Sequence, residues 1–199
     1  ASGQLGSIAA RNIDLKVTNT IENTGSLLAK ERMGIKAQNI QNNGGRIQAK
    51  AVSLDAEEDI VNLGGSIYAD DGLSLKAERD IRIETTTSQS RNTGDGVSIV
   101  RTEIDRVAGI FIGKNATGEL VMDAGNNLEI IGAEINNASE QTLQLNAGND
   151  ILVGSLALQQ QEHLQFDRKN YSNYDELTYH GSTINSQGGL SFNAGNNAT

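Results

Sequence analysis

The chain has 199 residues, no cysteine, no proline and a formal net charge of −9. The absence of cysteine excludes disulfides and cysteine-based metal sites, and the negative charge argues against nucleic acid and anionic lipid as partners, because both bind clustered Lys and Arg. Apolar residues make up only 37% of the chain, which argues against a bulky aromatic or helical core, and no apolar run of about eighteen residues, the length of a membrane-spanning helix, is present.

Residues 6–83 follow a repeat of about twenty residues. The apolar residues that lead each repeat stand 19, 20 and 20 positions apart: Ile8, Leu27, Ile47 and Ile67. Two further apolar sets recur at spacings of 19 to 21 residues: Ile13, Met33, Val52 and Leu73, then Ile21, Ile40, Ile60 and Ile81. Within each short run apolar and polar residues alternate, which is typical of a strand with one buried face. Gly- and Asn-rich segments between the runs predict sharp corners.

Three short strands per repeat are compatible with a sandwich or with a coil. A sandwich gives no reason for each strand to carry the same residues as the strand twenty positions later, whereas a coil stacks equivalent positions about 4.8 Å apart. We therefore predict an all-β fold, a right-handed parallel β-helix (solenoid) of rungs of about twenty residues, with ladders of Ile, Ala and Asn. The complete absence of proline fits a continuous sheet.

The repeat is interrupted at residues 84–107. The Thr-, Ser- and Asn-rich stretch to Gly96 predicts a loop, and Val97 to Val100 predicts a short strand after it. Such excursions from a solenoid often bind something, and long loops can equally be mobile filler; both interpretations stay open here.

The repeat resumes over residues 108–153. The corner sequence Ala-Gly-Asn-(Asn/Asp) occurs three times, at 124–127, 147–150 and 194–197. It predicts an Asn/Gly turn with an Asn ladder rather than a calcium site, because the spacing Gly-Gly-x-Gly-x-Asp is missing. A last rung occupies residues 181–199. Since the pattern runs to both ends and no signal-peptide pattern is present, we expect the chain to be a section of a longer protein, and to be monomeric.

A second, Tyr-rich excursion covers residues 154–180. It contains both histidines and four of the seven aromatic residues, and residues 170–174 predict its tip. One interpretation is an exposed patch that contacts a partner, because Tyr is enriched at interface centres. The other is that the rings cover an open side or end of the solenoid. The candidate partner-binding residues are His163, Phe166, Tyr171, Tyr174, Tyr179 and His180.

The acidic clusters do not indicate an active site. Some β-helices act on polysaccharides, and their sites need several carboxylates converging with Lys or Arg. Here the acidic clusters, Glu57-Glu58-Asp59 and Asp70-Asp71, lie beside turns and recur partly with the repeat. His163 and His180 lack metal-ligand spacing. We predict no catalytic, cofactor-binding or metal site, and therefore no enzyme.

With its repeats aligned, the chain resembles the filamentous hemagglutinin repeats of two-partner secretion exoproteins. The resemblance rests on Gly-Gly-Ser-Ile-Tyr-Ala-Asp-Asp-Gly-Leu-Ser-Leu-Lys-Ala-Glu-Arg-Asp-Ile (64–81), Leu-Gln-Leu-Asn-Ala-Gly-Asn-Asp-Ile (143–151) and residues 181–197. It covers nearly the whole chain apart from parts of 84–107. The last segment, with the Tyr-rich stretch before it, is similar to the distal repeats of contact-dependent growth inhibition effectors.

The resemblance implies a secreted, cell-surface location and export of the parent chain by an outer-membrane two-partner secretion transporter. It also implies a stalk that supports presentation and delivery of a toxin to a target cell. The alternative is an adhesin module that binds a host-cell glycan or protein through its extra-helical loops. The chain itself resembles neither a toxin domain nor the family's secretion domain.

Overall fold

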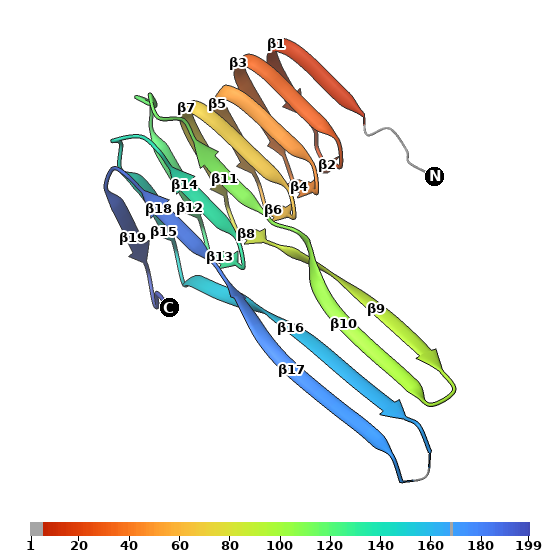
Figure 1. Cartoon of the computed structure of the whole chain (residues 1–199). Helices are drawn as coiled ribbons and strands as arrows, with labels where there is room; N and C mark the ends of the chain where they lie inside the picture. The colour runs from red at the N-terminus through yellow and green to blue at the C-terminus, as the bar shows by residue number, and fades with distance from the viewer. Residues whose placement is uncertain (1–5, 168) are drawn as a thin grey trace.

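The structure, a computed structural model, describes residues 6–167 and 169–199. Within these ranges every regular element is a β-strand, and the strands of successive repeats pair in parallel. They form a β-solenoid of about seven turns, here called rungs. Two long hairpins project from it (Figure 1). The prediction of an all-β parallel β-helix with two excursions is confirmed.

One sheet covers two sides of every rung, because its long strands bend. The pairing registers shift at each bend, for example between Ala49 and Ala51 in β5, and such bulges kink a strand. In rungs one to four the bent strands are β1 (Ser7–Lys16), β3 (Ser26–Ala37), β5 (Arg46–Ala56) and β7 (Ser66–Ala77). In rungs five to seven each is replaced by two shorter strands: β11 (Gly109–Ile112) and β12 (Leu120–Ala124), β14 (Glu134–Asn137) and β15 (Leu143–Ala147), β18 (Thr183–Ser186) and β19 (Leu190–Ala194).

A second sheet forms the third side. Its solenoid strands are β2 (Thr20–Asn23), β4 (Asn39–Asn43), β6 (Ile60–Leu63), β8 (Ile81–Glu84), β13 (Leu128–Ile131) and the first residues of β16 (Ile151–Gln165). Each strand follows the bent strand of its own rung and leads into the first side of the next rung. The chain therefore advances by one strand spacing, about 4.8 Å, per rung.

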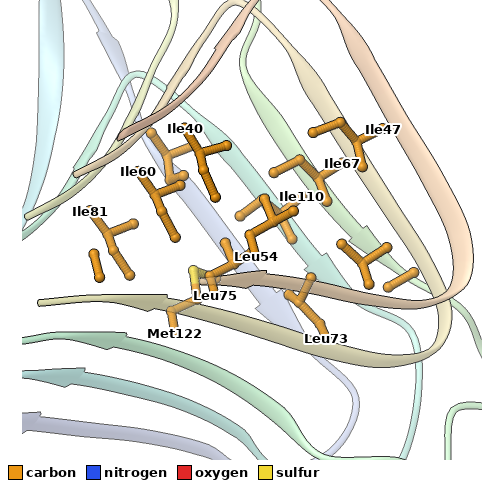
Figure 2. Close-up of a cluster of buried hydrophobic side chains, with 14 of the residues drawn as sticks. Ile40, Ile47, Leu54, Ile60, Ile67, Leu73, Leu75, Ile81, Ile110 and Met122 are labelled. Carbon is orange, nitrogen blue, oxygen red and sulfur yellow. The ribbon is translucent and has the colours of Figure 1, made fainter. Parts of the chain in front are cut away.

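The core is a set of apolar ladders along the solenoid axis. Ile47 pairs with Ile67, which in turn pairs with Ile110, and all three are fully buried. Leu54 and Leu75 stack in the same way on the second side. Figure 2 shows these rows, with Ile40, Ile60 and Ile81 on the third side, all pointing inward. Burying one such side chain contributes about 1.5–3 kcal/mol, so the periodic pattern supplies the stability of the solenoid.

A second ladder is polar and buried. Asn23, Asn42 and Asn62 stack at the corner after the third side, and each amide donates to the oxygen of the next, over 2.7 Å in both steps. Asn42 also donates to the carbonyl of Gly45, at 3.0 Å. The predicted Asn ladder is confirmed, and it explains why an amide is tolerated in the core: its donors and acceptor are satisfied by the neighbouring rungs.

We expect Asn42→Ala to destabilise the solenoid by about 2–4 kcal/mol, because it leaves the buried side-chain oxygen of Asn62 without its donor and breaks the hydrogen bond from the buried Asn23 amide. The matched control is Asn43→Ala, which removes only an exposed hydrogen bond to Glu22 and should cost about 0.5 kcal/mol or less. Urea unfolding of both variants measures the difference. Equal losses in the two variants would contradict a stabilising role for the ladder.

At three corners between the third side and the next rung, a glycine adopts the left-handed backbone conformation. Gly44, Gly64 and Gly132 have φ of 67°, 58° and 58°, a region that favours glycine. Both hairpins occupy this same corner: the registers of the flanking strands align residues 85–107, and again residues 155–181, with the single residue Gly132. Each hairpin therefore replaces one corner residue and leaves the ladders intact.

The predicted loop from residue 84 to Gly96 is wrong. Residues 86–94 form a strand, β9 (Thr86–Gly94), which pairs antiparallel with β10 (Val97–Arg106). The stretch has no apolar alternation because both of its faces are exposed, so the pattern that identifies half-buried strands is absent. The predicted strand from Val97 to Val100 is confirmed as part of β10.

Candidate functional site: the projecting sheet

The two hairpins combine into one antiparallel sheet outside the solenoid, here called the projecting sheet. Its strand order is β9-β10-β16-β17, where β17 is Tyr171–Gly181. The central contact pairs residues 97–101 of β10 with residues 164–160 of β16. β16 belongs to both parts, because its first residues pair with β13 in the solenoid. Figure 1 shows the four strands extending together away from the solenoid.

The hairpins meet because the pitch of the solenoid equals the spacing of strands in a sheet. β9 leaves the third side at rung four and β10 returns at rung five, while β16 leaves at rung six and β17 returns at rung seven. Successive rungs and neighbouring strands are both about 4.8 Å apart. Four strands that leave at four consecutive levels are therefore already at hydrogen-bonding distance. The corner between rungs five and six is the single residue Gly132, so no further hairpin projects between β10 and β16.

A charged pair joins the two hairpins. The Arg101 guanidinium of β10 lies 2.6 Å from a carboxylate oxygen of Glu162 in β16, and Gln160 donates to the same oxygen at 3.0 Å. These hydrogen bonds, from Arg101 first, lower the pKa of the Glu162 carboxyl below its usual range. Since both side chains are partly exposed, the pair contributes little to stability.

The alternation of strand residues divides the projecting sheet into two faces. Directly paired residues share a face, so the side chains on the side of Glu162 form the Glu162 face and the others form the His163 face. Tyr174 pairs with Glu162 and His180 pairs with Leu156, which places both on the Glu162 face. Residues Tyr171 and Tyr179 pair with Gln165 and Ala157 and lie on the His163 face.

Phe166 lies on neither face. It follows the end of β16 in the hairpin turn, where its backbone N–H donates to the carbonyl of Asn170 at 2.9 Å. The predicted tip at residues 170–174 is thus wrong, because Tyr171 to Tyr174 are already within β17. The six candidate residues are brought into one hairpin but not into one patch.

The alternative in which the rings cover the solenoid is also wrong. Phe166, Tyr171 and Tyr179 are 75%, 65% and 67% exposed, and Tyr174 is about half exposed. Apart from His180, every residue of β17 is exposed. Exposed aromatic groups gathered on one projecting element are typical of interaction sites.

The two histidines have different surroundings. The Nδ1 atom of His163 forms a hydrogen bond with the side-chain oxygen of Asn173, directly across from it, whereas His180 lies at the base of the hairpin on the other face. Within the described ranges, no group of three or more His, Asp and Glu side chains could hold a metal ion. The same part of the chain contains no helix able to cross a membrane.

The acidic clusters singled out in the sequence stabilise corners of the solenoid. Asp59 accepts a hydrogen bond from Arg79 one rung later, at 2.7 Å from Nε, and this bond holds the pKa of Asp59 below its usual range. Asp71 accepts from the backbone N–H groups of Thr117 and Gly118 and from the Thr117 hydroxyl. Each carboxylate thus satisfies polar groups of a neighbouring rung or loop.

Sequence reasoning missed four residues that give the projecting sheet its character. Arg101 and Glu162 lie 61 positions apart, and no sequence pattern in either excursion predicts that they form an ion pair. Leu177 and Asp175, by contrast, could have been placed with Tyr171 and Tyr179, since all four share the odd positions of one strand. What the sequence does not show is which strands of the two excursions are neighbours in the projecting sheet.

The chain is similar to known proteins that contain hemagglutinin repeats or match its repeat region. The family model described as hemagglutinin repeat matches residues 32–151. The chain is 29% identical to "tRNA nuclease CdiA" of Yersinia mollaretii over 96% of its own length and 7% of that protein. It is 26% identical to "Hemolysin" of Serratia marcescens over 78% of the chain and 11% of that protein. It is 32% identical to "tRNA nuclease CdiA" of Escherichia coli O6:K15:H31 over 66% of the chain and 5% of that protein.

The chain therefore spans 11% or less of the length of these relatives. No solved structure shows a significant match to it.

Proposed function

The chain belongs to the hemagglutinin-repeat family, and from this premise we propose that it is a non-catalytic stalk section whose projecting sheet contacts a partner on another cell. The family places it in a large secreted or cell-surface protein as a structural repeat module. The observation that carries the proposal is that the stabilising core and the exposed aromatic side chains lie in separate parts of the fold. The apolar ladders run along the solenoid, while Phe166 and the exposed tyrosines Tyr171, Tyr174 and Tyr179 project from one corner.

The specific role we propose is toxin presentation and delivery in contact-dependent growth inhibition. Two relatives carry the printed name of a tRNA nuclease, and they match this chain over only 5% and 7% of their lengths. A nuclease activity would then reside outside the matched section, and the stalk would position it. Export of the whole protein by an outer-membrane two-partner secretion transporter is part of the same proposal.

A second candidate is an adhesin module that binds a host-cell glycan or protein through the hairpins. The His163 face favours it, because amide and carboxylate groups lie beside exposed rings: Gln159 and Gln161 both lie within 3.5 Å of Asp175. The two candidates differ in the cell that is recognised.

We expect the labelled chain to bind intact bacteria saturably, and binding to vanish when residues 155–181 are replaced by one glycine. The tight corner at Gly132 is the template for this replacement, so the solenoid should keep its melting temperature within a few degrees. Flow cytometry on bacteria and on host cells distinguishes the two candidates.

A second variant, with residues 85–107 also replaced by glycine, serves as the control for the edge of β10 that the first replacement uncovers. If both variants fold and bind cells as well as the unmodified chain, the projecting sheet is not the contact site and the proposal fails.

A further inference from the structure

We propose that the outer edge of β17 binds an extended, basic strand of a partner protein by β-strand addition. The inference rests on the proposed role of the projecting sheet and names how the contact is made. In the described part of the chain β17 pairs only with β16, so its other edge is free over the strand's whole length. A free edge offers a row of backbone donors and acceptors to an incoming strand.

The backbone groups on that edge can be identified from one hydrogen bond. Gln165 donates its N–H to Gly96 in the hairpin on the other side of β16, at 2.6 Å. In an antiparallel sheet the residue paired with it, Tyr171, must then direct its own N–H and C=O away from β16. The same alternation turns every second residue outward: Tyr171, Asn173, Asp175, Leu177 and Tyr179.

The side chains along this edge define the partner's charge. Asp175 and Glu176 are consecutive, so they place one carboxylate on each face of β17. Among the described residues neither has a Lys or Arg within salt-bridge distance, and their contacts are to Gln159, Gln161 and the Tyr174 hydroxyl. Lys or Arg at two consecutive positions of an added strand would lie opposite these carboxylates, at the pair distance of about 5 Å.

The rings on the same edge add to the preference for a basic strand. On the His163 face, Leu177 is next to Asp175, and Tyr171 and Tyr179 lie four residues away on either side; on the other face Tyr174 lies beside Glu176. Exposed aromatic faces attract Lys and Arg side chains by cation–π contact, and they cover the apolar stems of those side chains.

The opposite edge of the projecting sheet lacks this chemistry and provides the internal control. β9 is also free on its outer side, but its side chains are Thr, Ser, Gln and Asn with the single cation Arg91. The alternation through β10 turns Gln89 outward there. The two edges therefore offer the same kind of backbone with different side chains.

The test uses a Val- and Thr-rich peptide of about ten residues, the length of β17, with Lys-Arg at its centre. A matched peptide carries Glu-Glu at the centre, and fluorescence anisotropy measures binding to the full chain. Leu177→Pro removes one outward N–H without touching the ladder to β16, and Leu177→Ala removes only the side chain. We expect Leu177→Pro to weaken binding about tenfold more than Leu177→Ala.

Gln89→Pro should leave binding of the basic peptide unchanged. Asp175→Asn combined with Glu176→Gln should abolish the preference for the basic over the acidic peptide. The inference is overturned if the basic peptide fails to bind, if both peptides bind equally to the unmodified chain, or if Leu177→Pro binds as well as Leu177→Ala.

In the cell-binding assay, Leu177→Pro and the glycine replacement, together with Tyr171→Ala and Tyr179→Ala, separate this inference from the proposed function. Cell binding that is lost without residues 155–181 but survives Leu177→Pro, and falls with Tyr171→Ala and Tyr179→Ala, would overturn strand addition in favour of binding by the His163 face. Cell binding that survives the glycine replacement would instead remove the proposed function itself.

Discussion

Leu54→Asp is expected to abolish folding of the solenoid. Leu54 lies between Ile35 and Leu75 of the neighbouring rungs and is 1% exposed. A carboxylate there would be buried without a partner, at a cost of several kcal/mol on top of the lost apolar contact. Because a domain of this size is stable by only about 5–15 kcal/mol, we expect loss of the β-type circular dichroism spectrum and, in size-exclusion chromatography, the earlier elution of an expanded chain.

The matched control is Ser53→Asp, which adds the same charge one residue earlier on the exposed side of the same strand. It should change the free energy of unfolding by about 0.5 kcal/mol or less. A folded Leu54→Asp variant with an unchanged melting temperature would show that the inward and outward positions of β5 are assigned the wrong way round.

One additional rung between the hairpins is expected to break the projecting sheet. A second copy of residues 108–132, inserted after Gly132, moves β16 away from β10 by about 4.8 Å, one strand spacing. The hydrogen bonds between residues 97–101 and 160–164 can then no longer form, and Arg101 is separated from Glu162. The solenoid should lengthen without loss of its ladders, because solenoid rungs contact only their neighbours.

Cysteines report this change directly, because the chain has none of its own. Val97 and Leu164 are paired across β10 and β16, at a position where the side chains of the two strands approach closely. We expect Val97→Cys with Leu164→Cys to form a disulfide on mild oxidation at the native spacing, and not in the variant with the added rung.

The control pair lies within one hairpin. Gln161→Cys with Asp175→Cys bridges β16 and β17 and should oxidise equally well in both backgrounds. If the β10–β16 pair also oxidises fully with the added rung present, the hairpins associate independently of their spacing along the solenoid.

The solenoid could be predicted because its information is local and repeated. Ile47 and Ile67, twenty residues apart, occupy the same buried position in successive rungs. Asn42 and Asn62 likewise occupy the same position at the corner. The projecting sheet has no such repetition. Thr86 to Gly94 form a strand with no buried side chain, so only the neighbouring β10 identifies it as one.

The candidate site was predictable in composition but not in geometry. The sequence places Tyr171, Tyr174 and Tyr179 in one excursion, and the parity of their positions separates Tyr174 from the other two once the segment is known to be a strand. The contact between Val97 and Leu164 could not be predicted, since it depends on the levels at which two hairpins leave the solenoid.

The pairing of the two hairpins also changes how the molecule should come apart. In a simple solenoid each rung is coupled only to its neighbours, so the ends fray one rung at a time. The contact of β10 with β16 ties rungs four and five to rungs six and seven from outside the core. Rungs four to seven consequently open as a single cooperative block, while rungs one to three remain free to exchange their amide hydrogens by stepwise opening.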